Sequence, residues 1–124
     1  MTPLPYKNYN RGQLYDLIEM QCNAAGMEHY LPRCMQACYD KRWLPQVDFN
    51  GCSVVQDELH PYPPCFLHDY EYVVHGGGPD ADKQFYVDLI DWGMKPSKAM
   101  RWYIGVRIGW LFYFKWRKMF ASSD

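Results

Sequence analysis

Apolar positions recur every three or four residues along much of the chain, which is the spacing of one face of an α-helix. In the first half this pattern predicts a helix over residues 12–25, ended by Gly26, and a short helix over residues 31–40. Prolines, a glycine and an asparagine interrupt the pattern over residues 43–64, so we expect an irregular loop there.

The second half of the chain predicts three more helices. Residues 65–74 contain no helix breaker, and the connection that starts at His75, HGGGPD, turns the chain into a helix over about residues 80–92. We expect these two helices to be antiparallel neighbours. Ser97 is suited to cap a last helix, which runs through KAMRWYIGVRIGWLFYFKWRKMF.

Composition agrees with a single, mainly helical domain over residues 1–124. A chain of this length buries one core, and its content of 48% hydrophobic, 18% aromatic and 22% charged residues excludes a disordered protein. The first ten residues, MTPLPYKNYN, lack the apolar stretch of a secretory signal, and the densest apolar run, IGWLFYF, is too short to cross a bilayer. We therefore expect neither export nor a membrane span.

Charge is divided unevenly along the chain. Up to Met94 there are 6 basic and 13 acidic residues, whereas residues 95–124 hold 7 basic residues and 1 acidic residue. The basic tail is expected either to meet the acidic body internally or to face an anionic partner such as lipid headgroups or nucleic acid. We do not expect nucleic acid as the partner, because the protein is acidic as a whole and has no recognisable nucleic-acid-binding module.

The last predicted helix combines indole and basic side chains, which anchor well at a lipid interface. It is therefore a candidate membrane or partner surface, formed by Trp110, Trp116, Lys115, Arg117 and Lys118. The competing interpretation is a packed core helix with a solvated basic end.

Titratable side chains are concentrated in the segment PPCFLHDYEYVVHGG, residues 63–77. Asp82 falls on the apolar stripe of the following helix, where a carboxylate is costly unless a donor satisfies it, and His68 is the natural candidate. Such a carboxylate fixes the histidine tautomer and leaves the other ring nitrogen free to act as a general base. Tyr72, one turn after His68, is expected to hold the same carboxylate. The competing interpretation is a satisfied core hydrogen bond without catalysis.

Asp69 points about a quarter-turn away from His68 and is free to bind a hard cation together with carbonyls of a nearby loop. The turn DFNGCS, residues 48–53, is such a loop, although a solvated helix acid is the competing interpretation. A disulfide between Cys52 and Cys65 would tether this loop to the start of the His68 helix.

Three motifs follow one another between about Asp48 and Leu89: NGCS, PPCFLHDYEY and ADKQFYVDL. Together they resemble the phospholipase A2 superfamily, especially its secreted bacterial and fungal branch, where a DGCS loop precedes C-x-x-H-D-x-x-Y and a later D-x-x-F-Y-x-D. The resemblance covers a third of the chain. It implies a phospholipase A2-like fold, in which two antiparallel core helices carry a histidine–aspartate pair between an N-terminal helix and a C-terminal aromatic and basic helix.

The same resemblance implies calcium-dependent hydrolysis of phospholipid esters at a membrane surface. His68 would activate water, with Asp82 and Tyr72 as its support, and Asp69 would bind the calcium ion. The loop would supply the remaining calcium ligands, from Asp48, Asn50 and Gly51.

The strings HDYEY, ADKQF and YIGVRIGW, with their spacing between Gly51 and Gly109, also look like those of small uncharacterised proteins of tailed bacteriophages and prophages. This second resemblance implies a protein made in the host cytoplasm and carried in the virion. Two functions remain open: phospholipid hydrolysis during membrane passage, and a non-catalytic virion or assembly role among other virion proteins on the same scaffold.

The five cysteines allow further alternatives. Cys22, Cys34 and Cys38 form either one disulfide and a buried thiol or three packed thiols. A nucleophilic role for Cys65 is less favoured than a disulfide. Zinc is disfavoured because no C-x-x-C or H-E-x-x-H spacing connects its possible ligands, which are His60, Cys65, His68, Asp69 and His75.

Overall fold

The computed structural model describes residues 8–45 and 62–121, and for residues 110–121 only the backbone. Within these ranges the protein is mainly helical and contains no β-strand. The elements are α1 (Arg11–Ala25), a 3-10 turn η1 (Glu28–Tyr30), α2 (Leu31–Tyr39), α4 (Pro63–His75), α5 (Pro79–Asp91) and α6 (Pro96–Ala121). The expected mainly α class is confirmed, and each described helix lies within two residues of its predicted bounds.

The start of α4 corrects one prediction. Pro63 and Pro64 were expected in the irregular loop, but they form the first turn of the helix. The first backbone N–H groups of a helix have no intrahelical acceptor, so proline loses no hydrogen bond there, and its fixed φ suits the helix. Proline therefore starts this helix instead of preventing it.

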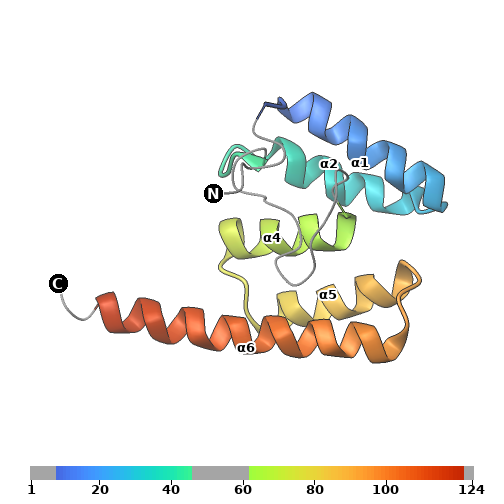
Figure 1. Cartoon of the computed structure of the whole chain (residues 1–124). Coiled ribbons are helices and arrows are strands. Elements are labelled where there is room, and N and C mark those ends of the chain that lie inside the picture. The colour runs from blue at the N-terminus through green and yellow to red at the C-terminus, as the bar shows by residue number, and fades with distance from the viewer. Residues whose placement is uncertain (1–7, 46–61, 122–124) are drawn as a thin grey trace.

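The helices pack in the order in which they follow along the chain. Figure 1 shows α1 beside α2 on one side, α4 in the middle, and α5 beside α6 on the other side, while the C-terminal half of α6 extends past the rest of the molecule. The core runs through all of these layers, and its fully buried members include Leu14, Ile18, Phe66, Leu89 and Ala99. Trp43 joins two layers, because its ring lies 5.4 Å from the rings of both Phe66 and Tyr70.

The glycine run between α4 and α5 sets the direction of the chain next to Tyr72. Gly76, Gly77 and Gly78 all have positive φ, at 85°, 65° and 107°, which is a conformation that residues with a side chain avoid. A Cβ atom on Gly77 would lie 2.6 Å from the ring of Tyr72. The backbone therefore passes directly over this ring, which requires glycine and brings α5 back antiparallel to α4.

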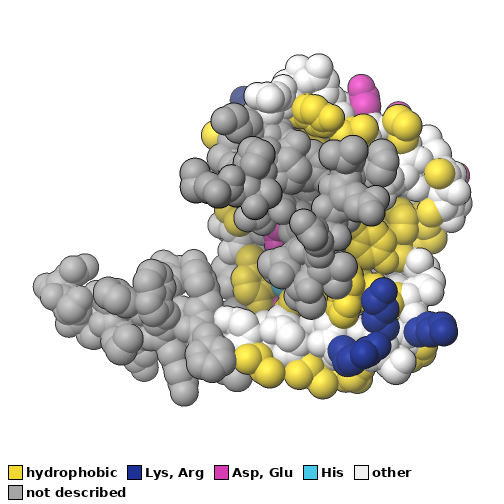
Figure 2. Space-filling view, in the orientation of Figure 1, with side chains coloured by type: hydrophobic (Ala, Val, Ile, Leu, Met, Phe, Trp, Pro, Cys, Tyr) yellow, Lys and Arg dark blue, Asp and Glu magenta, His cyan; other side chains and the backbone are white. Residues whose placement is uncertain are grey.

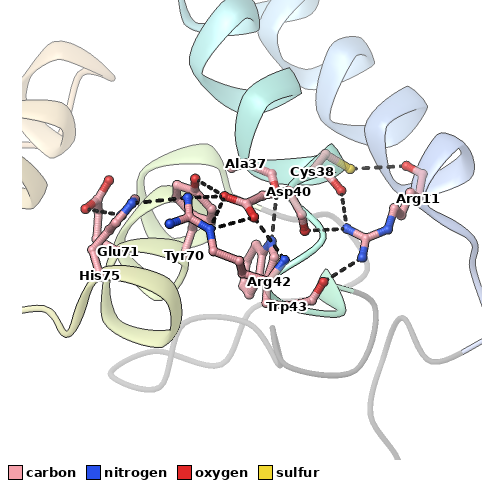
Figure 3. Close-up of polar contacts among 9 residues, drawn as sticks. All are labelled: Arg11, Ala37, Cys38, Asp40, Arg42, Trp43, Tyr70, Glu71 and His75. Carbon is pink, nitrogen blue, oxygen red and sulfur yellow. Dashed lines mark hydrogen bonds and ion pairs between the residues drawn. The ribbon is translucent and has the colours of Figure 1, made fainter.

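Polar contacts hold α1, α2 and α4 together at the end of α2 (Figure 3). The guanidinium of Arg11 donates to the backbone oxygens of Cys38, Asp40 and Trp43 at 2.8, 2.9 and 2.6 Å. The Cys38 carbonyl lies in the last turn of α2, where helical acceptors are left without partners, and the other two follow the end of the helix. The Asp40 carboxylate then accepts from the Tyr70 hydroxyl of α4 at 2.6 Å.

Replacing Arg11 with alanine is expected to destabilise the protein by about 2–3 kcal/mol, because it leaves three carbonyls without their charged donor. Chemical denaturation followed by circular dichroism measures the change. The exposed Lys41, near the same turn, provides the control: Lys41→Ala is expected to leave the unfolding midpoint nearly unchanged. Equal midpoints for both variants would contradict the role given to Arg11.

Candidate active site

The site is built around the carboxylate of Asp82, whose side chain has no exposed surface. Two donors share its Oδ1 atom: Nε2 of His68 at 2.8 Å and the hydroxyl of Tyr72 at 2.7 Å. A third donor, Nη1 of Arg107, contacts Oδ2 at 2.8 Å. The structure therefore brings together the three residues that the sequence suggested and adds one cation.

Helix spacing explains how α4 presents its two donors. His68 and Tyr72 are four residues apart, so they lie one turn from each other on the face turned toward α5. Their rings are in contact, with centroids 4.6 Å apart, and Phe85 of α5 covers the imidazole at 4.4 Å. Aromatic packing on these sides fixes the plane of the imidazole, while Asp82 fixes its rotation.

Sequence reasoning missed Arg107. This residue comes from α6, and its side chain is 23% exposed. An ionised carboxylate without exposed surface needs a compensating charge, and the guanidinium provides it. The signal in the sequence was a single cation inside the otherwise apolar and glycine-containing run YIGVRIGW, opposite a helix with a buried acid.

Burial lowers the pKa of His68 below its ordinary value, although the hydrogen bond to Asp82 opposes this effect. The imidazole is therefore neutral at neutral pH. A carboxylate only accepts hydrogen bonds when ionised, so Nε2 carries the proton and Nδ1 keeps its lone pair. No residue that the structure describes forms a hydrogen bond with Nδ1. A neutral histidine held in this way is suited to accept a proton from water.

Asp69, the next residue on α4, lies in a different environment. Burial alone raises the pKa of its carboxyl to about 7. Within the described ranges it forms no hydrogen bond and no ion pair. A desolvated carboxylate without a donor is unfavourable in the folded state, and a bound cation would relieve that cost.

The other predicted calcium ligands, Asp48, Asn50 and Gly51, lie outside the described residues. Among the residues that the structure describes, no group of three or more histidine, cysteine, aspartate or glutamate side chains is arranged to hold a metal ion. Cys65 is disulfide-bonded. Its expected partner, Cys52, also lies outside the described residues, so the pairing stays a prediction.

A shallow pocket beside His68 was not expected from the sequence. It lies between α4 and α5 and is lined by Arg33, Leu67, His68, Glu71, Ala81, Gln84, Phe85 and Asp88. One of its lining residues is a second buried carboxylate, Asp88, which accepts two hydrogen bonds from Arg33 at 3.0 and 3.1 Å. Gln84 and Tyr30 also donate to Asp88, at 2.9 and 3.0 Å. Because its oxygens accept hydrogen bonds from these donors, we interpret Asp88 as a structural group that joins α2 to α5.

The remaining predicted residues divide into two groups. Cys22, Cys34 and Cys38 are buried free thiols, which agrees with the alternative of three packed thiols. The proposed surface residues Trp110, Lys115, Trp116, Arg117 and Lys118 lie on the backbone of α6, but their side chains are outside the described part. No helix in the described ranges is long and apolar enough to cross a membrane.

Asp82→Asn is expected to lower the free energy of unfolding by about 2–4 kcal/mol, because it removes the negative charge that pairs with Arg107 and accepts a hydrogen bond from His68. Asp80→Asn is the matched control, since Asp80 is an exposed acid in the first turn of the same helix. Urea denaturation compares the two variants. Equal stability would mean that the Asp82 contacts contribute nothing.

The raised pKa of Asp69 predicts a pH-dependent stability in calcium-free buffer. The folded protein keeps a proton on Asp69 up to about pH 7, whereas the unfolded chain releases it near pH 4, so stability falls as the pH rises across this interval. Asp69→Asn is expected to remove this loss and to be more stable than the wild type at pH 8, on the order of 2–4 kcal/mol. Thermal unfolding at pH 5 and pH 8 measures this change in stability. Asp16→Asn is the control, because Asp16 is exposed. A wild type that becomes more stable from pH 5 to pH 8 would contradict a raised pKa of Asp69.

Comparison of the chain with models of protein families, with characterised proteins and with solved structures finds no match. The interpretation of the site therefore depends on its own geometry and on the resemblance of its motifs.

Proposed function

We propose that the protein hydrolyses phospholipid esters in a calcium-dependent reaction, on a phospholipase A2-like scaffold. One observation carries the proposal: His68 donates to a fully buried carboxylate at 2.8 Å while its other ring nitrogen has no partner among the described residues. Asp69 is the next residue, a desolvated acid without a donor among the described residues. A general base beside an unsatisfied cation ligand is the combination that this chemistry needs.

In the proposed reaction His68 acts twice. Its Nδ1 takes a proton from water while the water oxygen attacks the acyl carbon of the ester. The imidazolium that forms is stabilised by Asp82, which Tyr72 holds in place. His68 then gives the proton to the leaving alkoxide as the ester carbon–oxygen bond breaks. Fatty acid and lysolipid are released, and no covalent enzyme intermediate forms.

Asp69 fits the role of calcium ligand, because hard cations bind carboxylate oxygens and this carboxylate has no competing donor among the described residues. We propose that Asp48, Asn50 and Gly51 provide the other protein oxygens. When bound, calcium supplies positive charge that polarises the ester carbonyl and stabilises the oxyanion. The neutral His68 beside it suits this arrangement, because a cationic imidazole would repel the ion.

The proposed setting is passage of a bacteriophage through a membrane, which is supported by the resemblance of residues 51–109 to small phage proteins. A second candidate function is a non-catalytic virion or assembly protein. The contact that favours it is the ion pair of Arg107 with Asp82. With three donors the carboxylate is satisfied as a core group would be, and the cation weakens its support of an imidazolium.

Release of fatty acid from mixed phospholipid vesicles tests the first candidate. The wild type is expected to be active with calcium and inactive after chelation, and His68→Ala is expected to reduce the rate by about 10²–10⁴-fold because it removes the base. His75→Ala is the matched control, since His75 is an exposed histidine on the same helix. This variant is expected to keep nearly the wild-type rate.

Calcium binding provides an independent result. Calcium is expected to raise the melting temperature of the wild type at pH 8 but not that of Asp69→Asn. A folded wild type that neither binds calcium nor releases fatty acid would reject the enzymatic proposal and leave the structural role.

A further inference from the structure

The outer face of α6 combines exposed apolar and basic side chains. Met100, Ile104 and Ile108 are 43%, 47% and 48% exposed and stand four residues apart, so they form one stripe along the helix. The opposite face of α6 is directed inward, as the burial of Ala99 and Trp102 shows. The stripe is therefore turned away from the core, and we call it the α6 outer stripe.

Basic groups accompany this stripe. Arg101 and Lys98 are exposed on the same part of the helix, and Figure 2 shows dark-blue basic side chains over the first turns of α6 beside yellow apolar side chains along its outer edge. Residues 95–123 include no acidic residue, so the helix cannot neutralise itself. The partner of such a face has to be anionic.

The described part of the protein supplies little of that negative charge. Of the four basic residues at 95–107, only Arg107 forms an ion pair with another described residue, and its partner is the buried Asp82. Lys95, Lys98 and Arg101 form none within the described part of the chain. Lys98 instead lies over the ring of Trp102, 5.7 Å from its centroid. The acidic residues that the structure describes thus leave Lys95, Lys98 and Arg101 available.

We infer that the α6 outer stripe, with Lys98 and Arg101, is a contact surface for an anionic lipid bilayer. Apolar side chains with Arg101 beside them and Lys98 at the edge toward Trp102 suit the boundary between headgroups and acyl chains, where each group finds its own environment. A second copy of this chain is a less suitable occupant, because two such stripes would bring equal positive charges together. The inference rests on the proposed lipid hydrolysis for its biological purpose, and it adds anionic phospholipid as the preferred class of surface.

Co-sedimentation with vesicles tests the surface, using pure phosphatidylcholine and phosphatidylcholine mixed with phosphatidylglycerol. The buffer contains a chelator, and the protein carries His68→Ala, so neither calcium nor catalysis contributes. Binding is expected only to the anionic vesicles and is expected to weaken as salt is added. Arg101→Gln is expected to lower the partition coefficient about fivefold, and Ile104→Ser by about five- to tenfold.

Met35→Ser provides the matched control, because Met35 is 48% exposed on α2, in the layer that lies across α4 from α6. It is expected to bind anionic vesicles like its parent. The inference would be overturned if Met35→Ser lost as much binding as Ile104→Ser. It would also be overturned if the His68→Ala parent did not bind anionic vesicles at all. A dimer in analytical ultracentrifugation that Ile104→Ser dissociates while vesicle binding is absent would overturn it as well, since the stripe would then belong to a second copy.

The two proposals fail separately. Vesicle binding by the His68→Ala protein, with no fatty acid released by the wild type, keeps the lipid surface and rejects hydrolysis. Hydrolysis of dispersed lipid by a wild type that does not bind anionic vesicles keeps the enzyme and rejects the surface.

Discussion

The buried carboxylate of Asp82 is the group on which the arrangement of the second half of the protein depends. Its three donors come from α4 and α6, so one side chain of α5 positions both neighbouring helices. Desolvating a carboxylate costs several kcal/mol, which is on the order of the net free energy of unfolding of a whole domain. The three contacts therefore have to form together. The same requirement holds His68 in one tautomer, which is the state that a water-activating base needs.

The environment of Asp69 differs from that of Asp82. Asp82 is fully buried and fully satisfied, whereas Asp69 is desolvated without a described donor, and its pKa is raised to about 7. Two acids in such different environments indicate different roles. One supports the histidine, and the other is held in a state that a cation would improve. This contrast is the physical reason to prefer an active site over a purely structural network.

Local patterns in the sequence predicted the helices and the meeting of His68, Tyr72 and Asp82, because i, i+4 spacing and a short glycine connection between adjacent helices determine both. They did not predict Arg107, which is 25 residues from Asp82, because periodicity gives the inward face of a helix but not its register on its neighbour. The bond of Arg33 to Asp88, 55 residues apart, was missed for the same reason. The helical start at Pro63 was missed because proline was treated only as a helix breaker.

We infer that Asp82 holds a neutral His68 with the proton on Nε2, while Nδ1 keeps a lone pair that no described residue uses. Nitrogen-15 NMR of the imidazole in the calcium-free protein at neutral pH tests it most directly, because the two ring nitrogens have different shifts when only one is protonated. We expect a protonated Nε2, an unprotonated Nδ1 and a titration midpoint below the ordinary histidine pKa. A proton on Nδ1, or an imidazole that averages between tautomers as in water, would contradict it.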